Sequence, residues 1–450
     1  MKQSIPAQDG NPLIPLFKEP PTKWAVKRLK WSASGMYNGI WGDEPNGEDD
    51  VVCVRVADFD RVSNRVIDQP PTLRAVEEKF LENRKLEPGD LLIEKSGGGD
   101  NQLVGCVVSF DHQFDATCSN FVARIKPAIG VDSRYFVYLH AALYAARFNF
   151  PAIKQTTGIQ NLDAEAYFNI KVAFPTEEEQ DFIAGYLDRE TAYIDTLIAE
   201  KERMLTLLEE KRAALISQAV TRGLDPGVPL KPSGLDWLGD IPAHWEIKRL
   251  KYLAQVRGGL TLGKKYSTSN LIEMPYLRVA NVQDGHLNLE QVTTVEVPHS
   301  EAKGYLLKYG DVLMNEGGDI DKLGRGCVWR QEVSQCLHQN HVFAVRPFSV
   351  TSEWLSLWTS TFPAKHYFES RAKRATNLAS ISGTNIKELP VPMPPDEEQT
   401  RIQGFIEKST NRITGLQLEL RDTLRLLKER RSALITAAVT GQIDPEDMAA

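Results

Sequence analysis

The segment SALITAAVTGQIDP, residues 432–445, closely repeats AALISQAVTRGLDP, residues 213–226, half a chain earlier. In both copies, small and aliphatic residues lead to a glycine and then to Asp-Pro, a pattern typical of the end of a helix. A shift of 219 residues aligns residues 175–226 with residues 394–445 without a gap. The chain therefore contains the same helix twice.

Weaker similarities extend this repeat toward the start of the chain. WAVKRLKW (24–31) matches WEIKRLKY (245–252), and VRVADF (54–59) matches LRVANV (277–282). The repeated unit, about 220 residues long, far exceeds the period of a solenoid repeat. We therefore expect each copy to fold as a domain-sized unit with its own hydrophobic core.

The composition is that of an ordinary globular protein. Of the 450 residues, 42% are hydrophobic and 25% are charged. The net charge of −7 argues mildly against a protein that binds naked nucleic acid over its whole surface, but it permits a local basic face. Five cysteines without a CxxC pair favour a reducing cytoplasm over a disulfide framework. No segment has the pattern of a secretory signal or a membrane span.

Each copy combines two kinds of sequence. Residues 24–174 and 245–393 alternate short β-rich runs with Gly, Asp and Asn turns, and each part also contains an amphipathic helical pattern, at 131–148 and 351–370. The remainder of each copy has the pattern of one long helix. The predicted fold class is α+β, with two similar α/β globular domains in a pseudo-two-fold tandem repeat, separated by two long antiparallel coiled-coil helices.

Both long helices carry start signals. Thr176 and Glu179 form a capping-box pattern in the first copy, and Asp396 and Gln399 are assigned the same roles in the second. Acidic residues fill both first turns, as the helix dipole favours. Gly223 and Gly441 are the expected stop signals, so each helix should span roughly 46 residues, or about 70 Å. The predicted boundaries are a first globular domain at 1–175, a long helix at 176–222, an extended Pro- and Gly-rich linker at 223–241, a second globular domain at 242–394, a long helix at 395–441 and a tail at 442–450.

Steps of four and three residues mark a heptad seam on each helix. The predicted seam residues are Ile194, Ile198, Lys201, Leu205, Leu208, Arg212, Leu215 and Ala219 in the first helix, and Ile413, Gln417, Leu420, Leu424, Leu427, Arg431, Leu434 and Ala438 in the second. A helix this long cannot bury its stripe on one small globule, and propensity alone stabilises isolated helices little. We therefore predict that the two helices pair antiparallel.

Candidate catalytic and ligand motifs are weak. GGLTLGKK (258–265) resembles a phosphate loop, but Lys265 stands where that loop needs a hydroxyl, so a β-turn is favoured. Cys336, His338 and His341 are possible metal ligands, but residues 338 and 341 would point to opposite faces of a strand. Asp90 with Glu94 and Lys95 faintly resembles a nuclease carboxylate cluster, but the spacing is wrong and the second copy has Asn315 and Glu316. We predict no catalytic, cofactor-binding or metal-binding residue.

Polar and basic loops precede both long helices, at 154–162 and 370–385. Their cations, amides and hydroxyls are the groups that contact phosphates and base edges. The two loops differ in sequence, whereas the two helices are similar. This favours a shared frame that carries two different DNA-contacting loops over the alternative that both loops are merely solvated. The predicted DNA-binding residues are Lys154, Gln155, Thr156, Thr157, Gln160, Asn161, Arg371, Lys373, Arg374, Thr376, Asn377 and Ser380.

Several of these motifs are shared with one known family. They are the Pro…EEQ helix starts (175–180 and 394–399), the helix ends LISQAVTRGLDP and LITAAVTGQIDP, and the central SGLDWLGDIPAHWEIKRLKY (233–252). With the duplication, they make the chain resemble the DNA specificity subunit of type I restriction–modification systems over nearly its whole length. Residues 1–20 depart from the pattern, because they lack the SGLDWLGDIP run.

The resemblance implies a non-catalytic subunit. In that family the two globules are target recognition domains, and the helices set their spacing and bind other subunits. The implied partners are double-stranded DNA, two modification subunits that methylate adenine with S-adenosylmethionine, and restriction subunits that translocate and cut DNA with ATP and Mg²⁺. The resemblance implies no cofactor on this chain itself.

Two other classes of function stay open at this stage. A protein-binding scaffold with two globular heads on a coiled-coil spacer would lack a basic concave surface on each head. A self-contained nuclease or methyltransferase would need a carboxylate cluster or a cofactor loop. A two-domain DNA reader would recognise half-sites on one face of the duplex, near one helical turn (~34 Å) or a multiple apart.

Overall fold

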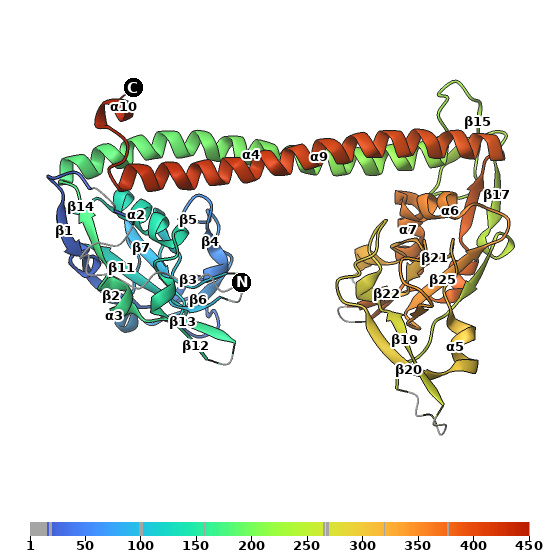
Figure 1. Cartoon of the computed structure of the whole chain (residues 1–450), viewed down its shortest axis with the longest axis horizontal. Coiled ribbons are helices and arrows are strands. Elements are labelled where there is room, and N and C mark those ends of the chain that lie inside the picture. Colours follow the sequence, from blue (N-terminus) through green and yellow to red (C-terminus); the bar gives the residue numbers. More distant parts are fainter. Residues whose placement is uncertain are drawn as a thin grey trace. The chain divides into compact units, whose positions relative to one another are not determined.

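The computed structural model describes residues 16–17, 20–98, 102–156, 158–263, 266, 270–318, 320–375 and 378–449. It divides into two compact units (Figure 1). Unit 1 comprises Met1–Arg203 and Leu420–Ala450, and unit 2 comprises Met204–Glu419. Each unit therefore contains one globular part together with one segment of each long helix. None of the described helices is both long enough and apolar enough to cross a membrane.

The globular part of unit 1 is built on a six-stranded sheet with the order β2-β11-β7-β9-β5-β4. These strands are β2 (Ala33–Asn38), β11 (Val122–Pro127), β7 (Asp90–Glu94), β9 (Val107–Phe110), β5 (Arg65–Val66) and β4 (Phe59–Asp60). Smaller sheets join β10 (Ala116–Cys118), β3 (Asp50–Val54) and β6 (Leu73–Ala75); β12 (Ile153–Thr156), β13 (Ile159–Leu162) and β8 (Ser96–Gly97); and β1 (Ala25–Arg28) and β14 (Lys171–Phe174). The helices are α1 (Glu78–Leu81), α2 (Ser133–Ala145) and α3 (Ala164–Phe168).

Unit 2 repeats this plan with a four-stranded central sheet of order β18-β25-β21-β23. These strands are β18 (Ala254–Arg257), β25 (Val342–Pro347), β21 (Val312–Asn315) and β23 (Gly326–Val328). The smaller sheets contain β20 (Thr293–Pro298), β19 (Leu271–Leu277) and β24 (Leu337–His338); β22 (Gly317–Gly318), β27 (Leu378–Ser380) and β26 (Lys373–Ala375); β17 (Glu246–Arg249) and β28 (Pro390–Met393); and β15 (Leu230–Pro232) and β16 (Asp240–Pro242). The short helices are α5 (His299–Tyr305), α6 (Ser352–Ser360), α7 (Phe362–Arg371) and α8 (Gly383–Lys387).

The central strands explain why each globule folds around its sheet. Every residue of β7 is buried, and so is every residue of β21. Burial of every residue means that both faces of these two strands are covered. Helix α2 packs on β7 and β9, and helix α6 packs on β21 and β23. The predicted α+β class with two similar globules is confirmed.

The long helices are α4 (Glu177–Arg222) and α9 (Asp396–Val439). The predicted capping box holds in α4, where Thr176 N–H donates to Glu179 at 3.0 Å and Glu179 N–H donates to the Thr176 hydroxyl at 3.3 Å. It is wrong in α9, because Asp396 is already the first helical residue and Pro395, which precedes it, has no side-chain oxygen to act as a cap. The stop glycines have φ of +74° and +72°, which suits residues without a Cβ.

The predicted seam is confirmed, since all sixteen of its residues are buried or half-buried. Polar contacts give the direction of pairing in each unit separately. In unit 1, Asp195 pairs with Arg431 and Glu202 pairs with Lys428, so residue numbers rise along α4 as they fall along α9. In unit 2, Gln417 donates to Glu209 at 2.7 Å. Antiparallel pairing of the two helices is therefore confirmed.

The segment predicted as an extended linker is folded. Strands β15 and β16 pair antiparallel, from Leu230 opposite Pro242 to Pro232 opposite Asp240. Leu238 and Ile241 are buried in the hydrophobic core of unit 2. The high Pro and Gly content of this segment indicated its turns, but not the apolar side chains that anchor it. The stated limits of the globular domains stay predictions.

Candidate nucleic-acid interface

The predicted DNA-binding residues lie mainly on two equivalent hairpins. In unit 1, β12 and β13 pair with Lys154 opposite Asn161, and β13 continues onto β8. In unit 2, β26 and β27 pair with Lys373 opposite Ser380, and β27 continues onto β22. The same shift of 219 residues that aligns the long helices also aligns these two hairpins. Each globule thus holds one hairpin by the same strand pairing.

The first hairpin exposes Lys154, Gln155 and Asn161. Lys154 pairs with Asp163 at 2.7 Å, although 75% of its side chain remains exposed. The Asn161 side-chain oxygen accepts a hydrogen bond from the Ser96 hydroxyl at 2.6 Å. This contact holds the Asn161 side chain in place on the exposed face of the hairpin.

The prediction that Gln160 faces solvent, as a contact to DNA would require, is wrong. Gln160 is only 3% exposed, and its side-chain oxygen accepts a hydrogen bond from the Val104 N–H at 3.2 Å. The segment forms a strand, in which alternate residues face opposite sides, so Gln160 points inward with Leu162. Ala379 takes the position of Gln160 in unit 2 and is also buried.

The second hairpin is more basic than the first. Arg371 at the end of α7 and Lys373 and Arg374 on β26 are all exposed. Among the described residues, none of these three cations forms an ion pair. Arg374 stands where Gln155 stands in the first hairpin, while the lysine beside it is kept. The predicted residues Thr157, Thr376 and Asn377, and the side chain of Thr156, lie outside what the structure describes.

The acidic residues Asp90 and Glu94 have structural roles. Asp90 pairs with the buried Arg124 at 2.6 Å, and Glu94 pairs with Arg61 at 2.7 Å. Unit 2 keeps the first of these contacts as Asp311 and Arg346, at 2.7 Å. Both carboxylates neutralise arginines inside the fold, so they do not form a metal-binding cluster.

The candidate metal ligands of unit 2 point in different directions. His338 is buried, and its Nδ1 lies 2.7 Å from the backbone oxygen of Val342. His341 is exposed and lies 2.6 Å from a Glu316 oxygen. Burial lowers the pKa of His338 and raises the pKa of Cys336 to about 12. No cluster of three His, Cys, Asp or Glu side chains suited to a metal ion occurs among the described residues. The phosphate-loop segment lies partly outside them.

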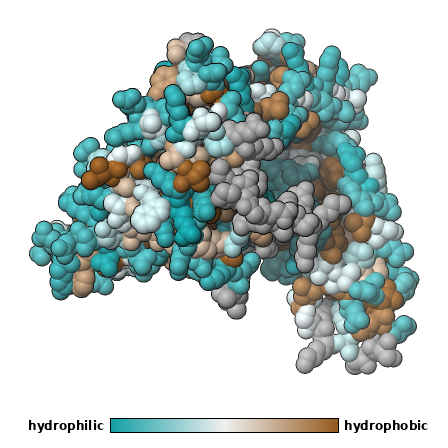
Figure 2. Space-filling view, turned by 60° about the vertical axis from the view of Figure 1, so that its left-hand side comes forward, coloured by the Kyte–Doolittle hydropathy of each residue, from teal (hydrophilic) through white to brown (hydrophobic). Residues whose placement is uncertain are grey.

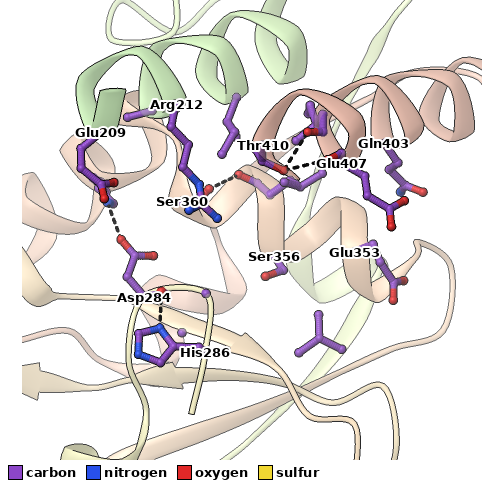
Figure 3. A pocket seen from close by; sticks show the side chains of 18 of the residues that line it. Glu209, Arg212, Asp284, His286, Glu353, Ser356, Ser360, Gln403, Glu407 and Thr410 are labelled. Atoms are coloured by element: carbon purple, nitrogen blue, oxygen red, sulfur yellow. Dashed lines mark hydrogen bonds and ion pairs between the residues drawn. The ribbon is translucent and has the colours of Figure 1, made fainter. Parts of the chain in front are cut away.

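A pocket of about 730 Å³ lies within unit 2, where its segments of α4 and α9 meet the globular part. Figure 3 shows Arg212 from α4, Glu407 from α9 and Glu353 from α6 around this space. Asp284 and His286 complete its lining on the opposite side, and Lys365 donates to Asp284 at 3.1 Å. The lining contains both acidic and basic side chains, so the pocket does not favour a ligand of one charge.

The EEQ motif has a structural function that the sequence did not reveal. Gln180 and Gln399 are both buried, with exposed fractions of 2% and 3%. Each side-chain amide donates to the backbone oxygen of the proline before its helix, Pro175 at 3.2 Å and Pro394 at 2.9 Å. In each copy this hydrogen bond connects the first turn of the long helix to the end of the preceding globule.

Comparison with known proteins gives one consistent result. Residues 242–424 match the family model described as the type I restriction modification DNA specificity domain. The EcoKI specificity subunit of Escherichia coli (strain K12) is 23% identical over 369 residues, covering 80% of this chain and 76% of that protein. The StySPI specificity subunit of Salmonella potsdam is 21% identical over 365 residues, with the same coverage.

A solved chain from work on complex assembly and conformational transition of the type I R-M system shares the fold. Its TM-score is 0.65 at 16% identity, and the match covers 94% of this chain and 100% of that chain. The fold, the duplicated frame with unlike hairpins and the related sequences all agree. Residues 242–424 therefore carry a type I restriction modification DNA specificity domain, and the chain as a whole is similar to the specificity subunits of type I restriction–modification systems.

Proposed function

We propose that this chain recognises a bipartite DNA target, with one half-site for each globule. The observation that carries the proposal is the pair of equivalent hairpins. Both keep a lysine, Lys154 or Lys373, next to positions that differ, Gln155 against Arg374 and Asn161 against Ser380. Lysine suits a phosphate contact, which fixes position, and the variable amide, hydroxyl and guanidinium groups suit base edges, which carry sequence information.

The catalytic work belongs, in this proposal, to partner subunits. Two modification subunits would methylate adenine with S-adenosylmethionine, and restriction subunits would use ATP and Mg²⁺ to translocate and cut the DNA. This chain would act in the cytoplasm without a cofactor of its own. The names of its relatives as specificity subunits support this division of roles.

We further propose that the helix seam sets the length of the unspecified gap between the half-sites. The antiparallel contacts found in each unit, such as Arg431 with Asp195 and Gln417 with Glu209, support a seam that a regular insertion could lengthen. Seven residues restore the heptad register and add about 10 Å of helix, close to three base pairs of duplex.

The experiment inserts one heptad between residues 191 and 215 of α4 and one at the facing level of α9, so that the seam stays in register. Methylation sites of the complex with its modification subunits are then mapped by sequencing. We expect the same half-site bases with a gap changed by about three base pairs. A matched control replaces one exposed heptad without changing the helix length and should leave the gap unchanged. Changed bases with an unchanged gap would contradict the proposal, and methylation without sequence preference would favour the scaffold alternative.

A further inference from the structure

A cluster of basic residues in unit 1 lies outside the hairpins. Lys27, Arg28, Lys30 and Lys171 line an open pocket of about 360 Å³ at the β1–β14 strand pair and the turn that follows β1. Trp31 lines the same pocket and is 66% exposed. The molecular face drawn in Figure 2 is mostly hydrophilic, with hydrophobic side chains in small separate groups. Four of the six residues that line this pocket are cationic, so the pocket favours an anionic partner.

Unit 2 contains the same basic segment, but its charges are neutralised. Lys248 pairs with Glu246 at 3.1 Å. Arg249 and Lys251 both pair with Glu388, at 2.6 and 2.7 Å. Strands β17 and β28 are paired in the same register as β1 and β14, so the two segments are equivalent residue by residue. Each of the three cations of this segment of unit 2 thus has a carboxylate partner.

Unit 1 has lost both of those carboxylates. Ala25 stands in the place of Glu246, and Asn169 stands in the place of Glu388. Arg28 donates to the neutral Asn169 oxygen at 3.2 Å, and the Lys30 ammonium lies 5.4 Å from the centre of the Trp31 ring. Unit 1 also gains a cation here, because Lys171 replaces Pro390.

Four cations therefore share one small site without a carboxylate partner. Within the part of the chain that the structure describes, none of Lys27, Arg28, Lys30 and Lys171 forms an ion pair. Burial lowers the pKa of Lys27, because desolvation disfavours its charged form. A bound anion would favour that charged form.

We propose that Lys27, Arg28, Lys30 and Lys171 bind the phosphate backbone of DNA, as a sequence-independent contact that unit 2 lacks. The proposal rests on the proposed function, which brings a duplex to this unit. Lysine and arginine side chains are the usual groups for such contacts. An acidic segment of a partner protein would have comparable charge, and the test below includes that outcome.

The test exchanges the neutralising residue between the two units. Asn169→Glu gives unit 1 the carboxylate that unit 2 carries, at a position where the equivalent backbone accepts glutamate. The full chain is titrated with a random-sequence duplex at several salt concentrations. We expect weaker binding and a slope of log K against log salt that is shallower by about one to two, since roughly 0.9 is lost per phosphate contact.

Two matched variants complete the experiment. Glu388→Asn frees Arg249 and Lys251 of unit 2, so it should strengthen binding and steepen the salt slope. Lys30→Gln with Lys171→Gln should weaken binding as Asn169→Glu does, and circular dichroism of each variant confirms folding. An unchanged salt slope in both unit 1 variants would overturn the proposal, and an unchanged slope with poorer co-purification of the modification subunits would assign the site to an acidic protein.

The same variants separate this proposal from the proposed function. The bases that the complex methylates report recognition, whereas the salt slope on random DNA reports the backbone contact. A shifted slope without any methylation specificity would retain the phosphate site and reject the bipartite recognition. Normal methylation sites with an unchanged salt slope would retain the bipartite recognition and reject the phosphate site.

Discussion

The two units share a frame but differ in how they use charge. Asp90 with Arg124 in unit 1 and Asp311 with Arg346 in unit 2 form the same internal ion pair. The helix-start glutamine described above is also kept in both units. These retained contacts lie inside the fold, where replacing one partner would leave the other unpaired. The shared residues therefore define the scaffold.

The differences lie at the surface and where the long helices meet the globules. Arg431 of unit 1 is buried and makes two hydrogen bonds to Asp195 and one to Asn64. Arg212, the equivalent residue of unit 2, lines the open pocket, and Thr414 replaces the carboxylate. The duplication thus kept the arginine but changed its environment. The same sequence position therefore pairs the two helices in unit 1, as Arg431, and lines an open pocket in unit 2, as Arg212.

The largest expected effect comes from removing Arg431. Arg431→Ala should lower the free energy of unfolding of unit 1 by about 2 kcal/mol, because Asp195 and Asn64 lose their partner. This is less than for a fully buried pair, since 27% of the Asp195 side chain is exposed. Urea unfolding followed by circular dichroism and fluorescence measures the change.

Arg212→Ala is the matched control for this prediction. No hydrogen bond or ion pair of Arg212 occurs among the described residues, so its removal should cost under roughly 0.5 kcal/mol. Equal losses from the two variants would show that the ion pair does not distinguish the units.

A smaller effect should follow from acidification. His140 is fully buried in unit 1 beside Phe136 and Tyr167, and Thr359 takes its place in unit 2. Burial lowers the pKa of His140 to about 3, well below its ordinary value of 6.5. The unfolded chain therefore binds a proton below pH 6.5 that the folded unit does not, and stability falls as the pH drops from there toward 3. Between pH 7 and 5.5 the loss should be about 1 kcal/mol.

His140→Gln should remove this part of the acid sensitivity, as measured by urea unfolding at pH 7 and pH 5.5. His366→Gln serves as the control, since His366 is exposed on α7. The buried His338 of unit 2 stays in both variants, so its own contribution cancels from the comparison. An acid-induced loss that is the same in both variants would show that His140 does not cause it.

The sequence predicted what depends on local pattern. Heptad steps located the seam, including the polar members Gln417 and Arg431, and positive-φ glycines ended the helices as expected. The sequence did not reveal contacts between distant segments, such as Arg249 with Glu388, because nothing local indicates that such residues meet. The inward direction of Gln160 depends on strand alternation in β13, which the polar, loop-like composition of residues 154–162 does not indicate.

The most direct test of the account exchanges one globule. Residues 24–174 are replaced by the corresponding segment of another specificity subunit, and the methylation sites of the reconstituted complex are sequenced. The account predicts that one half-site changes, while the other half-site and the gap stay the same. A change in both half-sites, or in neither, would contradict the claim that two copies of one frame carry two independent specificities.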